Sequence, residues 1–468
     1  MTSWRDRLLE VRLGPPGHGG FCVARYEGRV VFVRHGLPGE LVLARVTEDR
    51  GGAFCRADAV EIVEASPDRV PSACPVSGPG GAGCCDFAFA TPAAQRGLKA
   101  MVVAEQLRRI AGIEREIEVE PISGSEGPGV GWRTRVRLVV DADGRAGVHR
   151  YRSSEIVADL RCPQPVAGAL DGIAQRRWTP GADLVIAVDD EGARHIVELA
   201  PPIAEPSPRD DRSGRNRRRG PDGRPGGRPA AARGPRTTAG AGPGTGPDED
   251  GWRGADSQRR RTAARRAAAH TARDEWVIEG SGRAVQTVAG RRWEVSAAGF
   301  WQAHRGAAQC YSDLVAQWAR PDTGAHAWDL YSGAGVFAAR LAEQAGPAGS
   351  VLAVESAAGA VADGNAALTD LPWLSLRGGR VERWAAGRGG PRPQVVVLDP
   401  PRAGAGKPVV EAVTAAGPDR IVHIGCDPAA FARDLRLYLD AGYRLDALRA
   451  FDAFPATHHV ECVALLQR

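Results

Sequence analysis

The sequence lacks a long hydrophobic run, since no stretch approaches the roughly 18 consecutive apolar residues of a transmembrane helix. The first residues, MTSWRDRLLE, also lack the apolar stretch of a signal peptide. We therefore expect no membrane span and a cytoplasmic protein. The sequence also lacks a large excess of either charge, because the formal net charge of the 468 residues is only +5. With 43% hydrophobic and 25% charged residues, the composition is typical of a soluble globular protein of about two to four domains.

The small net charge is unevenly distributed. Residues 201–275 contain 17 arginines against 10 acidic residues, so the rest of the chain is slightly acidic. The segment 202–275 is rich in Arg, Gly, Pro and Ala, and its few large apolar side chains cannot offset the entropy of ordering it. We predict a disordered insertion, which either adds salt-sensitive affinity for nucleic acid or serves only as a spacer.

Residues 1–68 have the pattern of a small β domain. Turn residues separate three β-rich runs, which are Phe21–Tyr26, Arg29–Arg34 and Glu40–Val46. Residues 69–201 begin with a Cys/Gly-rich patch and continue with an amphipathic stretch and two strand-like runs, at Pro92–Gly112, Thr134–Asp141 and Glu155–Leu160. We expect a small barrel or open sheet first, followed by a central β-containing domain.

Residues 276–468 alternate short apolar β runs with helical stretches. The β runs are Ala327–Tyr331, Ser350–Val354, Pro393–Leu398 and Arg420–Ile424. The helical stretches are Gln302–Arg320, Val336–Gln344, Ala358–Leu368 and Pro428–Asp440. This alternation predicts an α/β fold with a doubly wound, Rossmann-like sheet. Because ligands of such sheets bind beyond the carboxyl ends of the strands, the residues just after each run are the candidate site.

The first of these strands ends in a glycine turn, Asp329-Leu-Tyr-Ser-Gly-Ala-Gly-Val-Phe337. Gly333 and Gly335 permit close approach of a ligand to the backbone before the next helix. Alone this is a weak signal, because the third glycine of a dinucleotide fingerprint is missing. The second strand ends at Glu355, which is placed either to accept hydrogen bonds from ribose hydroxyls or to cap the next helix. Together the two features favour an adenosine-type cofactor.

Chemistry-bearing residues follow the next two strands. Asp399-Pro-Pro-Arg402 combines a carboxylate with a rigid turn, and is more specific than the glycine motif. Cys426 precedes Asp427 and Pro428, a predicted N-cap and first helical residue. At a helix N-terminus we expect the dipole to lower the thiol pKa and favour a nucleophilic thiolate. The alternative is a small buried core cysteine.

Near the end of the chain, Glu461 stands at the entrance to a terminal strand, after FPATHHV. There a carboxylate is partly desolvated and either acts as a base or is a strand-edge acid. For His458 and His459 we expect turn or capping roles.

Five segments together resemble the RNA uracil-C5 methyltransferase family, whose members use S-adenosylmethionine to form 5-methyluridine in tRNA or rRNA. Over about 160 residues, the matching segments are Phe300-Trp-Gln302, DLYSGAGVF, DPPR, GCDP followed by ARDL, and FPATHHVE. The first 68 residues are similar to the TRAM domain, an OB-like RNA-binding barrel, through GGFCVAR and FVRHGLPGE. The resemblance spans the chain apart from the Arg/Gly/Pro insertion.

The resemblance implies roles for the candidate residues. Cys426 is the nucleophile that attacks C6 of uracil, and Glu461 is the base that removes the C5 proton after methylation. The residues implied to bind S-adenosylmethionine are Gln302, Tyr331, Gly333, Glu355 and Asp399, the last lying between cofactor and target base. For substrate, Phe300 stacks near the site and Arg402 supports the substrate or Asp399. A uridine in folded RNA must leave its stack to reach the thiolate.

The chain departs from the family pattern at four positions. Ser332 replaces a frequent Cys, Gly425 a usual Ser, Asp427 a usual Asn and His304 a common Asn. None of these changes removes the thiol or the base, so we expect activity.

Nine cysteines in a chain without a secretory signal argue against a disulfide scaffold. Many relatives carry a Cys…Cys-Gly-Gly-Cys patch and a distant fourth cysteine that bind a [4Fe-4S] cluster. The resemblance aligns Cys74, Cys85 and Cys162 with this set, and Cys84 would supply the fourth ligand from an adjacent position. Zinc or an empty, degenerate site are the alternatives.

The N-terminal domain places arginines among aromatic residues, a combination that suits single-stranded nucleic acid. These residues are Arg25, Arg29, Arg34 and Arg45 with Phe21, Tyr26 and Phe32. A solvated face over a small core is the alternative. We expect a monomeric RNA methyltransferase; the rival interpretations are methylation of cytosine C5 or an exocyclic amine, and a non-catalytic RNA-binding protein that keeps the fold.

Overall fold

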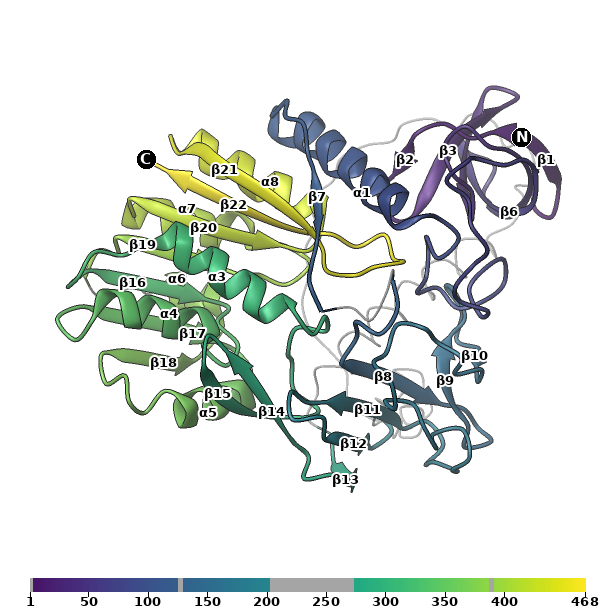
Figure 1. Ribbon diagram of the computed structural model, residues 1–468. Helices are drawn as coiled ribbons and strands as arrows, with labels where there is room; N and C mark the ends of the chain where they lie inside the picture. Colours follow the sequence, from purple (N-terminus) through teal and green to yellow (C-terminus); the bar gives the residue numbers. More distant parts are fainter. Residues whose placement is uncertain (1–2, 125–128, 203–272, 387–390) are drawn as a thin grey trace, which may run out of the picture. The chain divides into compact units, whose positions relative to one another are not determined.

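The computed structural model describes residues 3–124, 129–202, 273–386 and 391–468 (Figure 1). Contacts join Met1–Ala200 and Glu275–Arg468 into one unit. The predicted disorder of residues 202–275 falls almost entirely outside the described residues. Within the described ranges, no helix is both long and apolar enough to cross a membrane.

The N-terminal strands form a six-stranded sheet in the order β1-β5-β6-β4-β3-β2. Their bounds are β1 Leu8–Arg12, β2 Pro16–Gly17, β3 Phe21–Tyr26, β4 Arg29–Arg34, β5 Leu41–Asp49 and β6 Phe54–Glu64. Alternate residues of β4, such as Val31 and Val33, are fully buried, as expected for a sheet with one face on its core. The predicted runs at Phe21–Tyr26 and Arg29–Arg34 are confirmed to the residue.

A second sheet follows in the central part of the chain, in the order β10-β9-β8-β11-β12-β13. Its strands are β8 Arg135–Val140, β9 Ala146–His149, β10 Ile156–Val157, β11 Asp183–Val188, β12 Arg194–Leu199 and β13 Glu275–Glu279. Leu199 of β12 pairs with Glu275 of β13. The strands that flank residues 200–274 in the chain, β12 and β13, are therefore antiparallel neighbours in one sheet. A separate hairpin joins β14 Arg283–Val288 to β15 Arg291–Ser296.

The C-terminal sheet has eight strands in the order β18-β17-β16-β19-β20-β22-β21-β7. Its strands are β7 Val119–Pro121, β16 His326–Leu330, β17 Ser350–Glu355, β18 Leu374–Gly378, β19 Val395–Leu398, β20 Arg420–Gly425, β21 Arg444–Asp452 and β22 Glu461–Gln467. The strands from β18 to β20 are parallel, whereas β22 is antiparallel to β20 and to β21. The predicted doubly wound α/β fold is thus confirmed.

Helices cover both faces of this sheet (Figure 1). They are α3 Ala307–Ala319, α4 Val336–Ala345, α5 Ala358–Ala367, α6 Val381–Ala386, α7 Gly406–Ala416 and α8 Pro428–Asp440. One core contains side chains of α3 and α4, and the other contains those of α7 and α8. The sequence did not predict β18, α6, α7 or the edge strand β7.

Helix α1, Pro92–Gln106, comes from the central part of the chain yet packs in the second of these cores. Its N-cap is Thr91, whose Oγ1 accepts from the Ala94 N–H at 3.3 Å, and proline occupies its first turn. A π-helical turn, Leu107–Ala111, extends it to Gly112, which is left-handed at φ 69°. The predicted amphipathic stretch is therefore a helix that ends in a glycine cap.

Candidate active site

The predicted nucleophile, Cys426, lies between strand β20 and helix α8. Asp427 caps the helix, because its Oδ1 accepts from the Ala429 and Ala430 N–H groups at 3.1 and 2.9 Å. This confirms the predicted N-cap. A Cβ added to Gly425 would lie 2.9 Å from the Phe431 ring, so the glycine fits the close approach of helix to strand.

The environment of Cys426 differs from the prediction. Burial raises the pKa of its thiol to about 12, and the nearby carboxylates Glu461 and Asp399 raise it further, while Arg402 opposes them. The expected lowering by the helix dipole was wrong, because desolvation and two negative charges outweigh one helix end. These surroundings disfavour the thiolate of Cys426 unless a positive charge or a substrate changes them.

Glu461 lies beside Cys426 because of strand register. In the antiparallel pair β20–β22, Gly425 is opposite Cys462. Cys426 follows directly after the end of β20, and Glu461 is the first residue of β22, so the thiol and the carboxyl lie at neighbouring strand ends. Glu461 is 4% exposed, and its Oε1 has no hydrogen-bond partner. Burial and the charge of Asp399 raise its pKa well above the usual value, which makes its carboxylate a stronger proton acceptor.

Asp399 follows β19, the neighbour of β20 on the other side. Gln302 donates from Nε2 to Asp399 Oδ2 at 3.4 Å. Burial raises the pKa of Asp399 to about 7. Two residues assigned to the cofactor by resemblance therefore meet beside the predicted nucleophile, although 97 positions separate them.

The two glycines of the turn after β16, Gly333 and Gly335, have left-handed backbone conformations. Gly333 has φ 55° and an open position at its Cβ, so a ligand can approach there. Tyr331 has φ 64°, which is uncommon for a side chain of its size and marks a strained strand end. Its hydroxyl donates to Glu382 at 3.2 Å.

Polar atoms at this turn suit a hydroxyl-rich ligand. Glu355 Oε2 accepts from the Gly333 N–H at 3.0 Å, and its Oε1 accepts from the Ala357 N–H at 2.6 Å. Glu355 thus holds the turn and the segment before α5, and its contact with ribose hydroxyls stays a prediction. Ser332 Oγ and Asp329 Oδ1 are buried and have no partner. Unpaired buried polar atoms beside an open glycine fit the cofactor that the sequence predicts.

Phe300 and Arg402 lie at the rim. Phe300 is 74% exposed, two residues before Gln302, and is free to stack on an unpaired base. Arg402 is also exposed and has its guanidinium 3.4 Å from His459 Nε2. Both positions are compatible with substrate contacts.

The cysteine patch brings sulfur atoms together without forming a metal site. Cys74 and Cys84 each interact with the thiol of Cys85, which also accepts from Gln164 Nε2 at 3.2 Å. Cys162 lies near Cys84 and Cys74, and burial raises its pKa to about 11. Among the residues described, however, no three His, Cys, Asp or Glu side chains have an arrangement that could hold a metal ion. The patch therefore gives the predicted cluster no support beyond its donor atoms.

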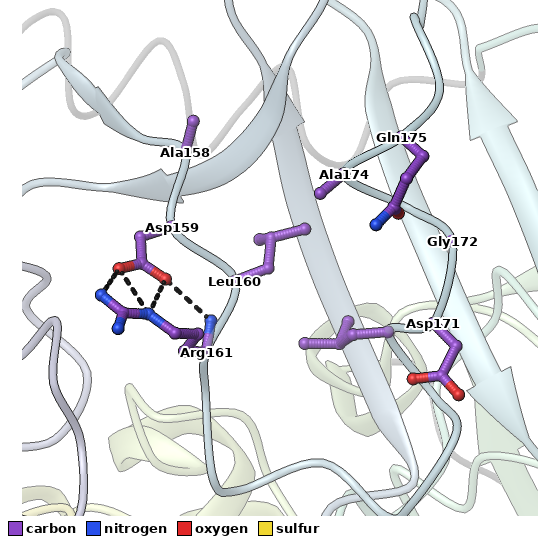
Figure 2. Close-up of a pocket in the computed structure, with 9 residues that line it drawn as sticks. Ala158, Asp159, Leu160, Arg161, Asp171, Gly172, Ala174 and Gln175 are labelled. Atoms are coloured by element: carbon purple, nitrogen blue, oxygen red, sulfur yellow. Dashed lines mark hydrogen bonds and ion pairs between the residues drawn. The ribbon is translucent and has the colours of Figure 1, made fainter.

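An open pocket occurs elsewhere, in the central part of the chain (Figure 2). It is lined by residues 158–161 and by Leu170, Asp171, Gly172, Ala174 and Gln175. An exposed ion pair, Asp159–Arg161, lies at one side. None of the predicted site residues lines this pocket.

The predicted RNA-binding arginines of the N-terminal sheet divide into two groups. Arg29 and Arg34 are buried in ion pairs with Asp49 and Asp86, so the expectation that they contact RNA was wrong for these two. Arg25 and Arg45 are exposed.

An aromatic face lies on the same sheet. Phe32 packs 4.8 Å from Phe21 and 5.5 Å from Phe54, measured between ring centroids. Arg56 lies over Phe21 and Phe32, and Phe54 is 51% exposed. Sequence patterns missed Phe54 and Arg56, because only strand pairing places them beside the predicted aromatics.

Two further residues around the site were also missed. Asp434 of α8 accepts from the Ala405 and Gly406 N–H groups at 2.6 and 3.1 Å, and so ties the start of α7 to the helix that begins beside Cys426. His18 has its Nε2 3.1 Å from Asp427 Oδ2. Asp434 lies in the ARDL segment, and this motif could have identified it from the sequence. No local sequence pattern marks His18.

A Rossmann-like sheet with a glycine turn after β16 and an acid at the end of β17 is typical of nucleotide-binding α/β proteins. The family model for tRNA (uracil-5-)-methyltransferase matches residues 392–468, and that for the TRAM domain matches residues 7–60. A solved structure with this fold is the tRNA (uracil-54, C5)-methyltransferase of Pyrococcus abyssi in complex with S-adenosyl-L-homocysteine. It is 18% identical with a TM-score of 0.62, and the match covers 98% of this chain and 100% of that one.

Curated relatives match along the whole chain. An uncharacterized RNA methyltransferase of Streptomyces coelicolor is 40% identical, with 98% of this chain and 92% of the relative covered. The 23S rRNA (uracil(1939)-C(5))-methyltransferase RlmD of Alkalilimnicola ehrlichii is 30% identical, with 98% and 96% covered. The chain therefore belongs to the RNA uracil-C5 methyltransferase family, as its motifs predicted.

Proposed function

We propose that this protein transfers a methyl group from S-adenosylmethionine to C5 of a uridine in structured RNA, through a covalent bond between Cys426 and C6 of the base. The observation that carries the proposal is the register of β20 and β22, which places a thiol and a buried carboxyl at adjacent strand ends. Asp399 follows the next strand. Membership of the family, and relatives named for this reaction on both tRNA and rRNA, support it.

The reaction needs these groups because uracil C5 is a poor nucleophile. Addition of the Cys426 sulfur to C6 moves the ring electrons to C5 and the C4 carbonyl. C5 then takes the sulfonium methyl, and S-adenosylhomocysteine leaves. Glu461 accepts the C5 proton, and the electrons of that C–H bond restore the C5–C6 double bond and expel the sulfur. The positive sulfonium favours the thiolate that burial and the two carboxylates otherwise disfavour.

The cofactor would lie at the ends of β16 and β17. Gly333 leaves room for it, and Glu355 is held in place by the turn and has lone pairs for the ribose. Gln302 and Asp399 lie between this turn and Cys426, and Tyr331 borders it with a fixed backbone. These residues bind and orient the sulfonium compound, whose chemistry supplies the methyl group.

RNA would contact other parts of the chain in addition to Cys426. The target base must leave its stack, and exposed Phe300 offers a surface for a displaced neighbour. On the N-terminal sheet, Phe21, Phe32 and Phe54 with Arg56 combine stacking surfaces with a cation, which suits a single-stranded segment of the same RNA. An RNA substrate of this kind fits the cytoplasmic location predicted from the sequence.

The iron–sulfur cluster remains a separate proposal. Four thiols are sufficient ligands, but Cys84 and Cys85 are adjacent in the chain and their side chains interact with each other. No step of the reaction above uses a cluster. Anaerobic purification followed by iron and sulfide analysis and visible absorption tests it, with Cys85→Ser as the variant that should lose any signal.

Methyl transfer tests the proposed function. The protein is incubated with methyl-labelled S-adenosylmethionine and unmodified transcripts of tRNA and of 23S rRNA, and the digested nucleosides are separated. We expect label in 5-methyluridine and none with Cys426→Ala. Label in 5-methylcytidine or an N-methylated nucleoside would move the assignment to another base. RNA binding without label, in the presence of an active family enzyme as control, would favour a non-catalytic binding protein.

A further inference from the structure

Arg402 is a cation that acts on both the Cys426 thiol and the Glu461 carboxyl group. Its charge favours the ionised forms of Cys426 and Glu461, against the effect of burial and of Asp399. Arg433 donates to the carbonyl of the next residue, Ala403, at 2.5 Å. The Arg402 side chain is exposed, however, and a long exposed side chain has many rotamers.

His459 is the neighbour that holds this side chain. Arg402 has a guanidinium nitrogen 3.4 Å from His459 Nε2. Burial lowers the pKa of His459 to about 3, so the ring is neutral and its Nε2 can accept from the guanidinium. An arginine has only donors, so the ring nitrogen must be the acceptor of this hydrogen bond.

The ring of His459 is itself fixed. His458 packs on it with ring centroids 4.1 Å apart, and Phe454 meets it edge-on at 5.8 Å. His458 Nδ1 lies 2.5 Å from Asp86 Oδ2, and the other oxygen of Asp86 accepts from Arg34 at 2.8 Å. A chain of contacts thus runs from a buried arginine of strand β4 to the two histidines and ends at Arg402.

We propose that His459 is a positioning residue, which directs the Arg402 guanidinium toward Cys426 and Glu461, and that His458 and Asp86 hold it for this role. The proposal deepens the proposed function and rests on it for its consequence in methyl transfer. The geometry also has a consequence that needs no RNA. Without the His459 acceptor, Arg402 turns to solvent, and Cys426 loses the cation that favours its thiolate.

The rate at which iodoacetamide alkylates Cys426 at one fixed pH reports the effect of the Arg402 charge, because the thiolate is the reacting form. Peptide mass spectrometry separates Cys426 from the other eight cysteines. The charged groups around the thiol are Glu461, Asp399, Asp427 and Arg402, and the His459 variants leave all four of these residues unsubstituted. We expect Arg402→Ala to slow alkylation about threefold to tenfold and His459→Ala to slow it by a similar factor.

Two comparisons distinguish positioning from a structural role. In the Arg402→Ala background, His459→Ala should have no further effect, because the two residues act as one unit. His459→Gln should restore most of the rate, since its amide oxygen can also accept from the guanidinium. Independent effects, or no rescue by Gln with a normal melting temperature, would overturn the proposal.

A functional readout follows in the same variants. If the protein methylates uridine, His459→Ala should lower kcat about as much as Arg402→Ala. Absence of methyl transfer by the wild type would contradict the proposed function alone, because alkylation still decides the role of His459.

Discussion

Lys99 and Asp452, 353 residues apart in the chain, form an ion pair of 2.5 Å in which the lysine side chain is fully buried. The Lys99 ammonium also donates to the Phe454 carbonyl at 3.0 Å. Gln95, one turn earlier on α1, accepts from the Ala456 N–H at 2.7 Å. Helix α1 therefore holds the loop 453–460, which connects β21 to β22 and delivers Glu461 to the active site.

Replacing Lys99 with Met should lower the free energy of unfolding by about 3–5 kcal/mol, because Asp452 is left as an unpaired buried charge. Chemical denaturation measures this. Arg108→Met on the π-helical turn after α1 is the matched control, since its ion pair with Glu105 is exposed and contributes about 0–1 kcal/mol. Equal small effects of the two substitutions would show that the buried pair does not hold the loop.

Replacing Glu461 with Gln should lower the methyl-transfer rate about 10²- to 10⁴-fold, the range for removal of a positioned general base. Because only the final proton removal is blocked, a methylated RNA–protein complex should accumulate with ordinary RNA. Denaturing gel electrophoresis detects it. Slow turnover without any covalent complex would assign Glu461 to an earlier step.

Replacing Glu355 with Ala should weaken S-adenosylmethionine binding about tenfold or more, since the variant loses both an acceptor for ribose hydroxyls and the support of Gly333. Calorimetric titration measures the affinity. Glu411→Gln, an exposed carboxylate paired with Lys407 on α7, should leave it unchanged. Unchanged binding in the Glu355 variant would place the cofactor elsewhere.

Stability should fall with rising pH because of Asp329. Burial raises its pKa from 3.8 to about 8, so the folded protein holds a proton that the unfolded chain has released. The contribution is complete below pH 4 and is lost as the pH rises through about 8. Asp329→Asn, which keeps an acceptor for the Ala338 N–H, should flatten the profile of melting temperature between pH 5 and 8. An identical slope in both proteins would rule out Asp329 as the source.

Local sequence patterns were sufficient to predict most strands and helices of the C-terminal half. Buried β runs such as Arg420–Ile424 and the capped start of α8 at Asp427 depend on nearby residues, so the sequence predicts them. The short edge strand β7 is different. It joins the sheet beside β21 from more than 300 positions away, and three residues give no periodic signal.

The errors share a physical cause. The thiol pKa of Cys426 was judged from its own helix, whereas Glu461 and Asp399 arrive from other strands. Arg29 and Arg34 were taken for surface cations, because their acidic partners lie 20 and 52 residues along the chain. Charge environments depend on tertiary contacts that no sequence window contains.

The central claim is that Cys426 bonds to a uracil, and trapping tests it most directly. The protein is mixed with S-adenosylmethionine and RNA transcribed with 5-fluorouridine, in which the C5 fluorine cannot leave as a cation. We predict a covalent RNA–protein complex that survives denaturation, carries the RNA on the Cys426 peptide and is absent in Cys426→Ala. A complex on another residue, or none while RNA binding persists and a known family enzyme traps in parallel, would contradict the account.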